Sequence, residues 1–108
     1  MHITILHAKN IELTDAIQTY IEEKFASLGK YMKALEPVDK CDIEIGKSTE
    51  HHQKGKVFYA EITMQIPGDL IRIETTEEDL YAAIDKAKDE LKEKLIQIKE
   101  RRIDARKG

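Results

Sequence analysis

Basic side chains crowd the end of the chain. The last ten residues read KERRIDARKG and include Lys99, Arg101, Arg102, Arg106 and Lys107. Lysine and arginine neutralise the phosphates of nucleic acids, so this basic tail, residues 99–108, is suited to a polyanion. The net charge is -3, yet residues 80–108 hold half of the 18 basic side chains and fewer than a third of the 21 acidic ones. This asymmetry favours a polyanionic partner, and a solvated helix laced with salt bridges is the alternative.

The other residue types that could do chemistry do not form a recognisable site. His51 and His52 are adjacent in a polar loop, without a carboxylate or thiol at ligand spacing, so we expect them to be solvated. His2 and His7 have odd spacing on one strand and point to opposite faces. Cys41 faces the core by alternation, which predicts a buried, inert thiol. With no nucleophile elbow, phosphate loop or paired catalytic acids, we expect no enzyme, metal, cofactor or small-molecule substrate.

The composition predicts a single domain over residues 1–108. Hydrophobic residues make up 41% of the chain and charged residues 36%, which suits a small globular fold with a densely charged surface. The apolar runs are too short to cross a bilayer. The N-terminus lacks a basic start, a long apolar stretch and a cleavage site, and the single cysteine agrees with a reducing compartment. We therefore expect a cytoplasmic protein with no membrane partner.

The first half of the chain predicts a strand, a helix and a further strand. HITILHA, residues 2–8, is a short β-rich run with Ile3 and Ile5 on one face. Thr14 is a good helix cap, and apolar residues then recur at helical spacing through residue 28, with Tyr20 and Tyr31 on the shoulder of the apolar stripe. Pro37 stops this helix. CDIEIG, residues 41–46, alternates apolar and polar side chains as a half-buried strand does.

The second half predicts two more strands and a long helix. VFYAEITMQIP and LIRIETT alternate in the same way, and Gly68 in the turn between them is free to take a positive φ. Thr76 and the acids that follow are expected to open the final helix. Its core stripe is Leu80, Ile84, Ala87, Leu91, Leu95 and Ile98. Tyr81, near its start, packs against the sheet rim or stacks on a base.

These elements give an α+β fold with the order β-α-β-β-β-α. We expect a four-stranded mixed sheet, because the strand–helix–strand unit favours a parallel pair and the remaining strands an antiparallel meander. The two helices must then lie side by side on the single buried face, with a groove between them.

The element order and two segments resemble the ribosome hibernation promoting factor family, also called ribosome-associated inhibitor A or sigma-factor modulation proteins. The segments are ELTDAIQTYIEEKFASLGKY in the first helix and EEDLYAAIDKAKDELKEKL at the start of the second. The resemblance implies binding to the small ribosomal subunit and its rRNA, in the mRNA and tRNA channel, and inhibition of translation in stationary phase or stress. The chain resembles the short form, which lacks the separate C-terminal dimerising domain.

The resemblance and the helical wheel together indicate which side chains contact RNA. Lys24 falls on a usually basic family position, Lys30 lies close to another, and Lys99 and Arg101 fall on the family's basic ending. On a helical wheel, Lys94 and Arg101 share one shoulder of the second helix's stripe. The expected RNA-binding residues are Lys24, Lys30, Lys88, Lys92, Lys94, Lys99, Arg101, Arg102 and Arg106.

Several positions depart from the family's pattern. Ser27, Glu90, Glu93 and Gln97 stand where the family usually has basic residues. Either the RNA contact has shifted to the uninterrupted row formed by Lys88, Lys92, Lys99 and Arg106, or the affinity is lower, or the role has diverged.

Two other functions fit the same fold. The wet sheet face or an exposed edge strand could form a homodimer or another protein contact, with RNA irrelevant. Helices on one face of a sheet are also typical of double-stranded RNA-binding modules. Size-exclusion chromatography, a plain RNA duplex and purified ribosomes would separate these alternatives.

Overall fold

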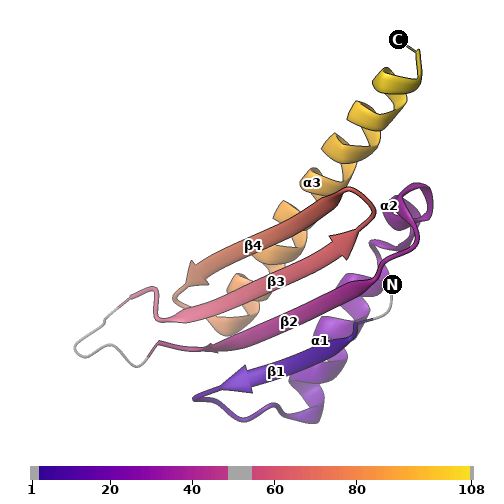
Figure 1. Ribbon diagram of the computed structural model, residues 1–108. Coiled ribbons are helices and arrows are strands. Elements are labelled where there is room, and N and C mark those ends of the chain that lie inside the picture. The colour runs from indigo at the N-terminus through magenta and orange to yellow at the C-terminus, as the bar shows by residue number, and fades with distance from the viewer. Residues whose placement is uncertain (1–2, 49–54, 108) are drawn as a thin grey trace.

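The structure, a computed structural model, describes residues 3–48 and 55–107. Its four strands form one sheet in the order β1-β2-β3-β4 (Figure 1). β1 (Ile5–Lys9) pairs in parallel with β2 (Lys40–Lys47). β3 (Phe58–Ile66) and β4 (Asp69–Glu77) complete the sheet as antiparallel neighbours. The predicted mixed sheet and the β-α-β-β-β-α order are confirmed.

The first helical region is broken into three parts. α1 (Asp15–Ala26) begins after Thr14, whose hydroxyl accepts a hydrogen bond from the backbone N–H of Ile17 at 3.2 Å, as the cap prediction requires. α2 (Gly29–Met32) and η1 (Lys33–Leu35), a 3₁₀ turn, continue the chain up to Pro37. The short α2 changes the direction of the chain and carries Lys30 and Tyr31 toward the last helix.

The last helix, α3 (Leu80–Lys107), starts later than the sequence predicts. Thr76 does not cap it, because β4 continues through this residue, which pairs with Tyr59 of β3. The cap is Asp79, whose carboxylate accepts a hydrogen bond from the N–H of Ala82 at 3.0 Å. The acids expected in the first helical turn therefore precede the helix, whose first turn is free of them.

The core lies between one face of the sheet and the helices that cover it (Figure 1). The predicted stripe of α3 is confirmed, since its six residues are at most 8% exposed. Cys41 is fully buried, and this burial raises the pKa of its thiol to about 11. The prediction that Ile3 and Ile5 share a face was wrong: Ile3 packs against the core, as do Leu6 and Ala8 of β1, whereas Ile5 is 54% exposed on the opposite face. In this short strand, apolar residues occupy both odd and even positions, so the alternation of apolar and polar residues does not show which face is buried.

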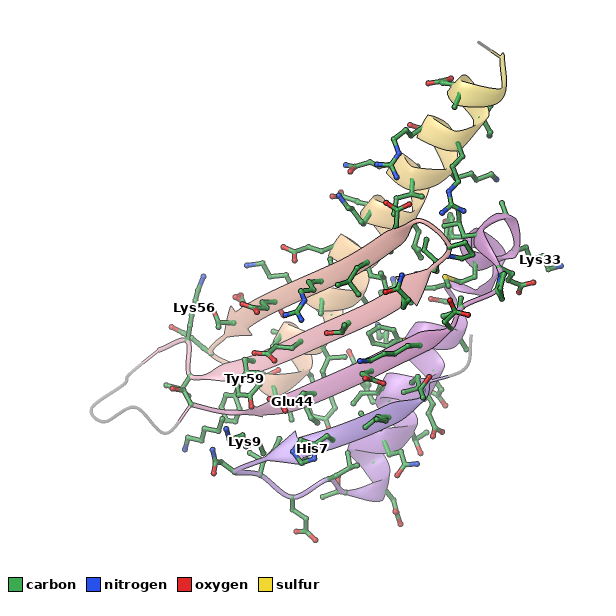
Figure 2. The ribbon with its side chains drawn as sticks, viewed as in Figure 1. His7, Lys9, Lys33, Glu44, Lys56 and Tyr59 are labelled. Atoms are coloured by element: carbon green, nitrogen blue, oxygen red, sulfur yellow. The ribbon has the colours of Figure 1, made fainter. Side chains whose placement is uncertain are left out.

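The opposite face of the sheet is open and carries a row of acids, with Lys9 and Arg72 close to it. His7, Glu44, Glu61 and Glu74 are direct neighbours in one row across the four strands. Burial and the charges of Glu44 and Glu74 raise the pKa of Glu61. The hydroxyl of Tyr59 donates to Glu44 at 2.8 Å, and Figure 2 shows these two side chains together on this face. This row of acids is poorly suited to phosphates, whereas the helices on the other side carry most of the predicted cations.

Candidate nucleic-acid interface

The cations of α3 sort onto two sides of the helix. One side faces the first helical region: Asp85 contacts Tyr20 of α1, Lys92 contacts Tyr31 of α2, and Lys99 borders a hollow with Leu35 of η1. The other side faces the turn between β3 and β4, where Arg101 bonds Asp69. On a helical wheel, Lys88 lies on the same side as Lys92 and Lys99. We call Lys88, Lys92 and Lys99 the interhelix row.

Tyr31 brings together two of the predicted cations. The ammonium of Lys30 lies 5.2 Å from the ring centroid of Tyr31, and the ammonium of Lys92 lies 5.4 Å from the same centroid. Both are cation–π contacts, in which the electron-rich ring face attracts the positive charge. Lys30 comes from α2 and Lys92 from α3, so the fold joins residues that are far apart in sequence.

Lys24 is held by an acid of α3. Its ammonium lies 3.6 Å from the carboxylate of Asp85 and 5.2 Å from the ring centroid of Tyr20. Tyr20 also donates a hydrogen bond of 2.6 Å to Asp85, which, together with burial, raises the pKa of the Tyr20 hydroxyl to about 12. The Tyr20 and Tyr81 rings meet edge to face at 4.7 Å. This cluster joins α1 to α3 and places Tyr81 against another aromatic side chain.

Arg101 and Arg102 are both engaged by the turn that opens β4. Arg101 donates to the two carboxylate oxygens of Asp69 at 2.8 Å and 2.9 Å. Arg102 donates to Asp69 at 3.2 Å and also to the carbonyl of Pro67. These hydrogen bonds lower the pKa of Asp69, against the burial that would raise it. The contacts fix the helix at the point where it leaves the sheet; beyond it, the end of α3 projects from the rest of the molecule (Figure 1).

The remaining predicted cations differ in their surroundings. Lys88 lies 3.2 Å from Asp89, its neighbour along the helix. Lys94 and Lys99 are exposed and form no ion pair with the residues that the structure describes. Arg106 belongs to α3, but its side chain lies outside the described part of the chain. Lys99 therefore combines an exposed charge with a place on the interhelix row.

The acids that depart from the family's pattern lie away from the interhelix row. Glu90 and Glu93 are separated from that row by the helical rotation, and Gln97 lies on their side. Glu93 and Gln97 are exposed, and Glu90 is half-buried. Glu90, Glu93 and Gln97 thus lie on a different side of α3 from the interhelix row.

The sequence analysis did not identify the two acids, Asp69 and Asp85, and the Tyr31 ring that contact these cations. Asp69 was read only as part of a turn, Asp85 was not singled out, and Tyr31 was placed on the edge of the core. Asp69 and Arg101 are 32 residues apart in sequence. No local pattern links such partners, because their contact depends on how far α3 extends past the sheet.

Neither a metal centre nor a membrane span is found in the described chain. Among residues 3–48 and 55–107, no three or more His, Cys, Asp and Glu side chains are grouped to hold a metal ion. The helices described here include none long and apolar enough to cross a bilayer. His2, His51 and His52, considered above as ligands, lie outside the described residues.

Comparison with known protein families shows to which family this chain belongs. A family described as "Sigma 54 modulation protein / S30EA ribosomal protein" matches residues 4–103. The chain belongs to this family. The resemblance found in its two helices is thereby confirmed, and the S30EA match covers every strand and most of α3.

Individual members of the S30EA family extend the comparison. A "Ribosome hibernation promotion factor" from Deinococcus radiodurans is 31% identical over 98% of this chain, and a "Ribosome hibernation promoting factor" from Azotobacter vinelandii is 31% identical over 91%. This chain spans about half of the first relative, 53%, and 83% of the second. The crystal structure of the Thermus thermophilus Protein Y N-terminal domain has 35% identity and a TM-score of 0.68, covering 91% of this chain and 99% of that domain.

Proposed function

We propose that this protein binds the small ribosomal subunit in the channel for mRNA and tRNA, and that it inhibits translation during stationary phase or stress. The observation that carries the proposal is the S30EA family match over residues 4–103. The names of the two relatives, which describe ribosome hibernation, support it. The proposal needs no catalytic group, because a protein that occupies the channel excludes mRNA and tRNA by its volume.

The helical side of the molecule is the proposed contact surface. RNA binding without chemistry depends on cations that meet phosphates and on a shape that fits the RNA. The interhelix row and Lys30 supply cations from two helices. The acidic row on the open sheet face would be repelled by phosphates, so the sheet turns away from RNA in this arrangement.

Co-sedimentation with purified ribosomal subunits tests the binding. We expect the protein to travel with the small subunit, and Lys92→Glu with Lys99→Glu to weaken this association while leaving the fold intact. The matched control is Lys33→Glu with Lys86→Glu, which changes the net charge equally at exposed positions off the interhelix row. Lys33 points away from the molecule at the end of α2 (Figure 2). Equal losses from both pairs would show that only net charge matters.

Translation in vitro tests the inhibition separately. Added protein should slow synthesis, and ribosomes loaded beforehand with mRNA and initiator tRNA should be protected, because both would compete for the same volume. Unchanged synthesis under conditions in which the protein is demonstrably bound would exclude the inhibitor function. Binding to a plain RNA duplex as tight as binding to ribosomes would instead favour a double-stranded RNA module.

Self-association is a second candidate, favoured by one observation. β1 ends the strand order, so its outer edge has no partner among the described strands, and it exposes Ile5. Unpaired edges can pair with another chain. Size-exclusion chromatography of the wild type and of Ile5→Lys tests this: a dimer that Ile5→Lys abolishes would support it, and a monomeric wild type would exclude it.

A further inference from the structure

Two lysines converge on one tyrosine between α2 and α3. The ammonium groups of Lys30 and Lys92 both lie within 5.4 Å of the ring centroid of Tyr31. The Tyr31 ring and Lys92 are half-buried, whereas Lys30 is exposed. The Tyr31 ring therefore brings two positive charges from different elements to one point, which solvent can reach at the exposed Lys30.

No acid accompanies this pair of charges. Lys24 is matched by Asp85 and Lys88 by Asp89, but neither Lys30 nor Lys92 forms an ion pair with any residue in the described part of the chain. Like charges repel, and one aromatic ring compensates this only in part. Two uncompensated cations at a fixed point form a site of positive potential that an anion would stabilise.

The Tyr31 hydroxyl can contribute a directed hydrogen bond to such an anion. Burial raises the pKa of this phenol, but the neighbouring Lys92 and Lys30 outweigh that effect and lower it. A more acidic phenol is a stronger hydrogen-bond donor to a negatively charged oxygen. The three side chains thus offer two charges and one donor.

We propose that Lys30, Tyr31 and Lys92 form a single binding site for one phosphate of RNA, with both ammonium groups on the same phosphate and the tyrosine hydroxyl donating to it. The proposal rests on the proposed function, since it supplies a contact for that RNA surface. A polymer is favoured over a free anion because Lys99, exposed and without an ion pair among the described residues, extends the positive charge along α3 beyond Lys92. A repeating phosphate backbone can use such a row, and an isolated phosphate cannot.

Salt titrations of ribosome binding test whether one phosphate is shared. The variants are Lys30→Gln, Lys92→Gln and their combination, with Lys33→Gln and Lys86→Gln as controls. The measured quantity is the slope of the logarithm of the binding constant against the logarithm of the salt concentration. If both lysines neutralise one phosphate, the double variant should reduce the size of this slope by about 0.7. If each lysine neutralises its own phosphate on single-stranded RNA, the reduction should be about 1.4. The two single effects should also be non-additive. The shared site would be overturned if the variants lost no more ribosome affinity than the controls. It would also be overturned if the two single effects added up to the loss of two phosphate contacts.

The tyrosine is tested by Tyr31→Phe, which keeps the ring and removes only the hydroxyl. We expect binding to weaken roughly two- to twelvefold, as for one lost hydrogen bond, with both cation–π contacts retained. Circular dichroism and thermal unfolding check that the fold is unchanged. Wild-type affinity in a folded Tyr31→Phe variant would remove the hydroxyl from the site.

A probe without ribosomes separates this site from the proposed function. A single-stranded oligouridylate should shift the NMR signals of the Tyr31 ring, and Lys30→Gln with Lys92→Gln should abolish the shift. If the protein fails to bind ribosomes but passes this test, the proposed function fails and the phosphate site stands. The same titration is repeated with inorganic phosphate. If inorganic phosphate binds as tightly as the oligonucleotide, the site takes a small anion and the assignment to RNA is wrong. Ribosome binding with no Tyr31 shift overturns the site alone.

Discussion

Asp69 and Arg101 form a two-point contact between the start of β4 and the last turns of α3, with the guanidinium of Arg101 donating to both carboxylate oxygens at 2.8 Å and 2.9 Å. Only one nitrogen of Arg101 takes part, and a guanidinium has five N–H donors. Arg101 is therefore positioned by Asp69 and still has donors left for another acceptor.

The contact predicts a pH-dependent contribution to stability. Because the arginines lower the pKa of Asp69 in the folded state, the contribution is complete above the unfolded pKa, near 3.9, and is lost as the pH falls through the lower folded value. Asp69→Asn should cost about 1 kcal/mol at neutral pH, in the range of a good surface ion pair. Urea unfolding of both proteins at several pH values measures this difference. A difference that persists unchanged at about pH 2 would contradict the ionic origin.

The same substitution should change RNA binding. Asp69→Asn releases the donors of Arg101 that the carboxylate holds and removes a negative charge beside them, so ribosome binding should tighten. Asp104→Asn is the matched control, since it makes the same charge change at an exposed position on α3 that has no arginine partner among the described side chains. The measurement is a titration at several salt concentrations. Equal effects of the two variants would mean that Arg101 makes no direct contact.

Substitution of the acids on the side of α3 away from the interhelix row tests which side of the helix contacts RNA. Glu90→Lys with Glu93→Lys changes the local charge by four units at positions remote from the interhelix row. Because Lys30, Lys92 and Lys99 lie on the row's side without an ion pair among the described residues, we expect slightly tighter binding from long-range attraction, with little change in salt slope. An increase of about 0.7 to 0.9 for each new phosphate contact would show that RNA lies across the family's usual face instead.

The tyrosines should ionise in a definite order. Tyr20 and Tyr59 each have a pKa of about 12, the first mainly through its hydrogen bond to Asp85 and the second mainly through burial, whereas the pKa of Tyr31 is lowered from 10.0. A raised folded pKa means that the stabilisation is complete below the unfolded value and is lost as the pH rises through about 12.

An absorbance titration of phenolate formation tests this order. Tyr31 should ionise before Tyr20 and Tyr59, and Tyr20→Phe should remove part of the late phase. It should also destabilise the fold by about 1 kcal/mol, because Asp85 loses its hydrogen bond from α1. A late phase of unchanged amplitude in the variant would contradict the assignment to Tyr20.

The sequence predicted the features that depend on local periodicity. Cys41, Ile43 and Ile45 are buried because side chains alternate along a strand, and the stripe of α3 is buried because it repeats at helical spacing. The start of α3 was misplaced because Thr76 and Asp79 are both good caps. Thr76 pairs with Tyr59 in the sheet, which leaves Asp79 as the cap. This pairing depends on the tertiary structure and cannot be read from the local sequence.

The site was predicted less completely than the fold. Helical wheels placed Lys92 and Lys99 together, but they could not show that Tyr31 would meet Lys92, or that Asp69 would hold Arg101. Both contacts depend on how α2 turns after α1 and on how α3 crosses the sheet. A sequence read one element at a time gives the faces of helices and not their mutual rotation.

The length of α3 has an electrostatic consequence of its own. Acidic Glu77, Glu78 and Asp79 precede the helix, and the basic tail begins at Lys99, with 19 helical residues, 80–98, or about 28 Å between them. This separation is more than three times the Debye length of roughly 8 Å at physiological salt, so the two ends are screened from each other and a polyanion acts on each end separately. It attracts one end and repels the other, and the pair of forces is a torque. If RNA is the partner, as proposed, this torque would turn the approaching protein so that the basic tail of α3 leads.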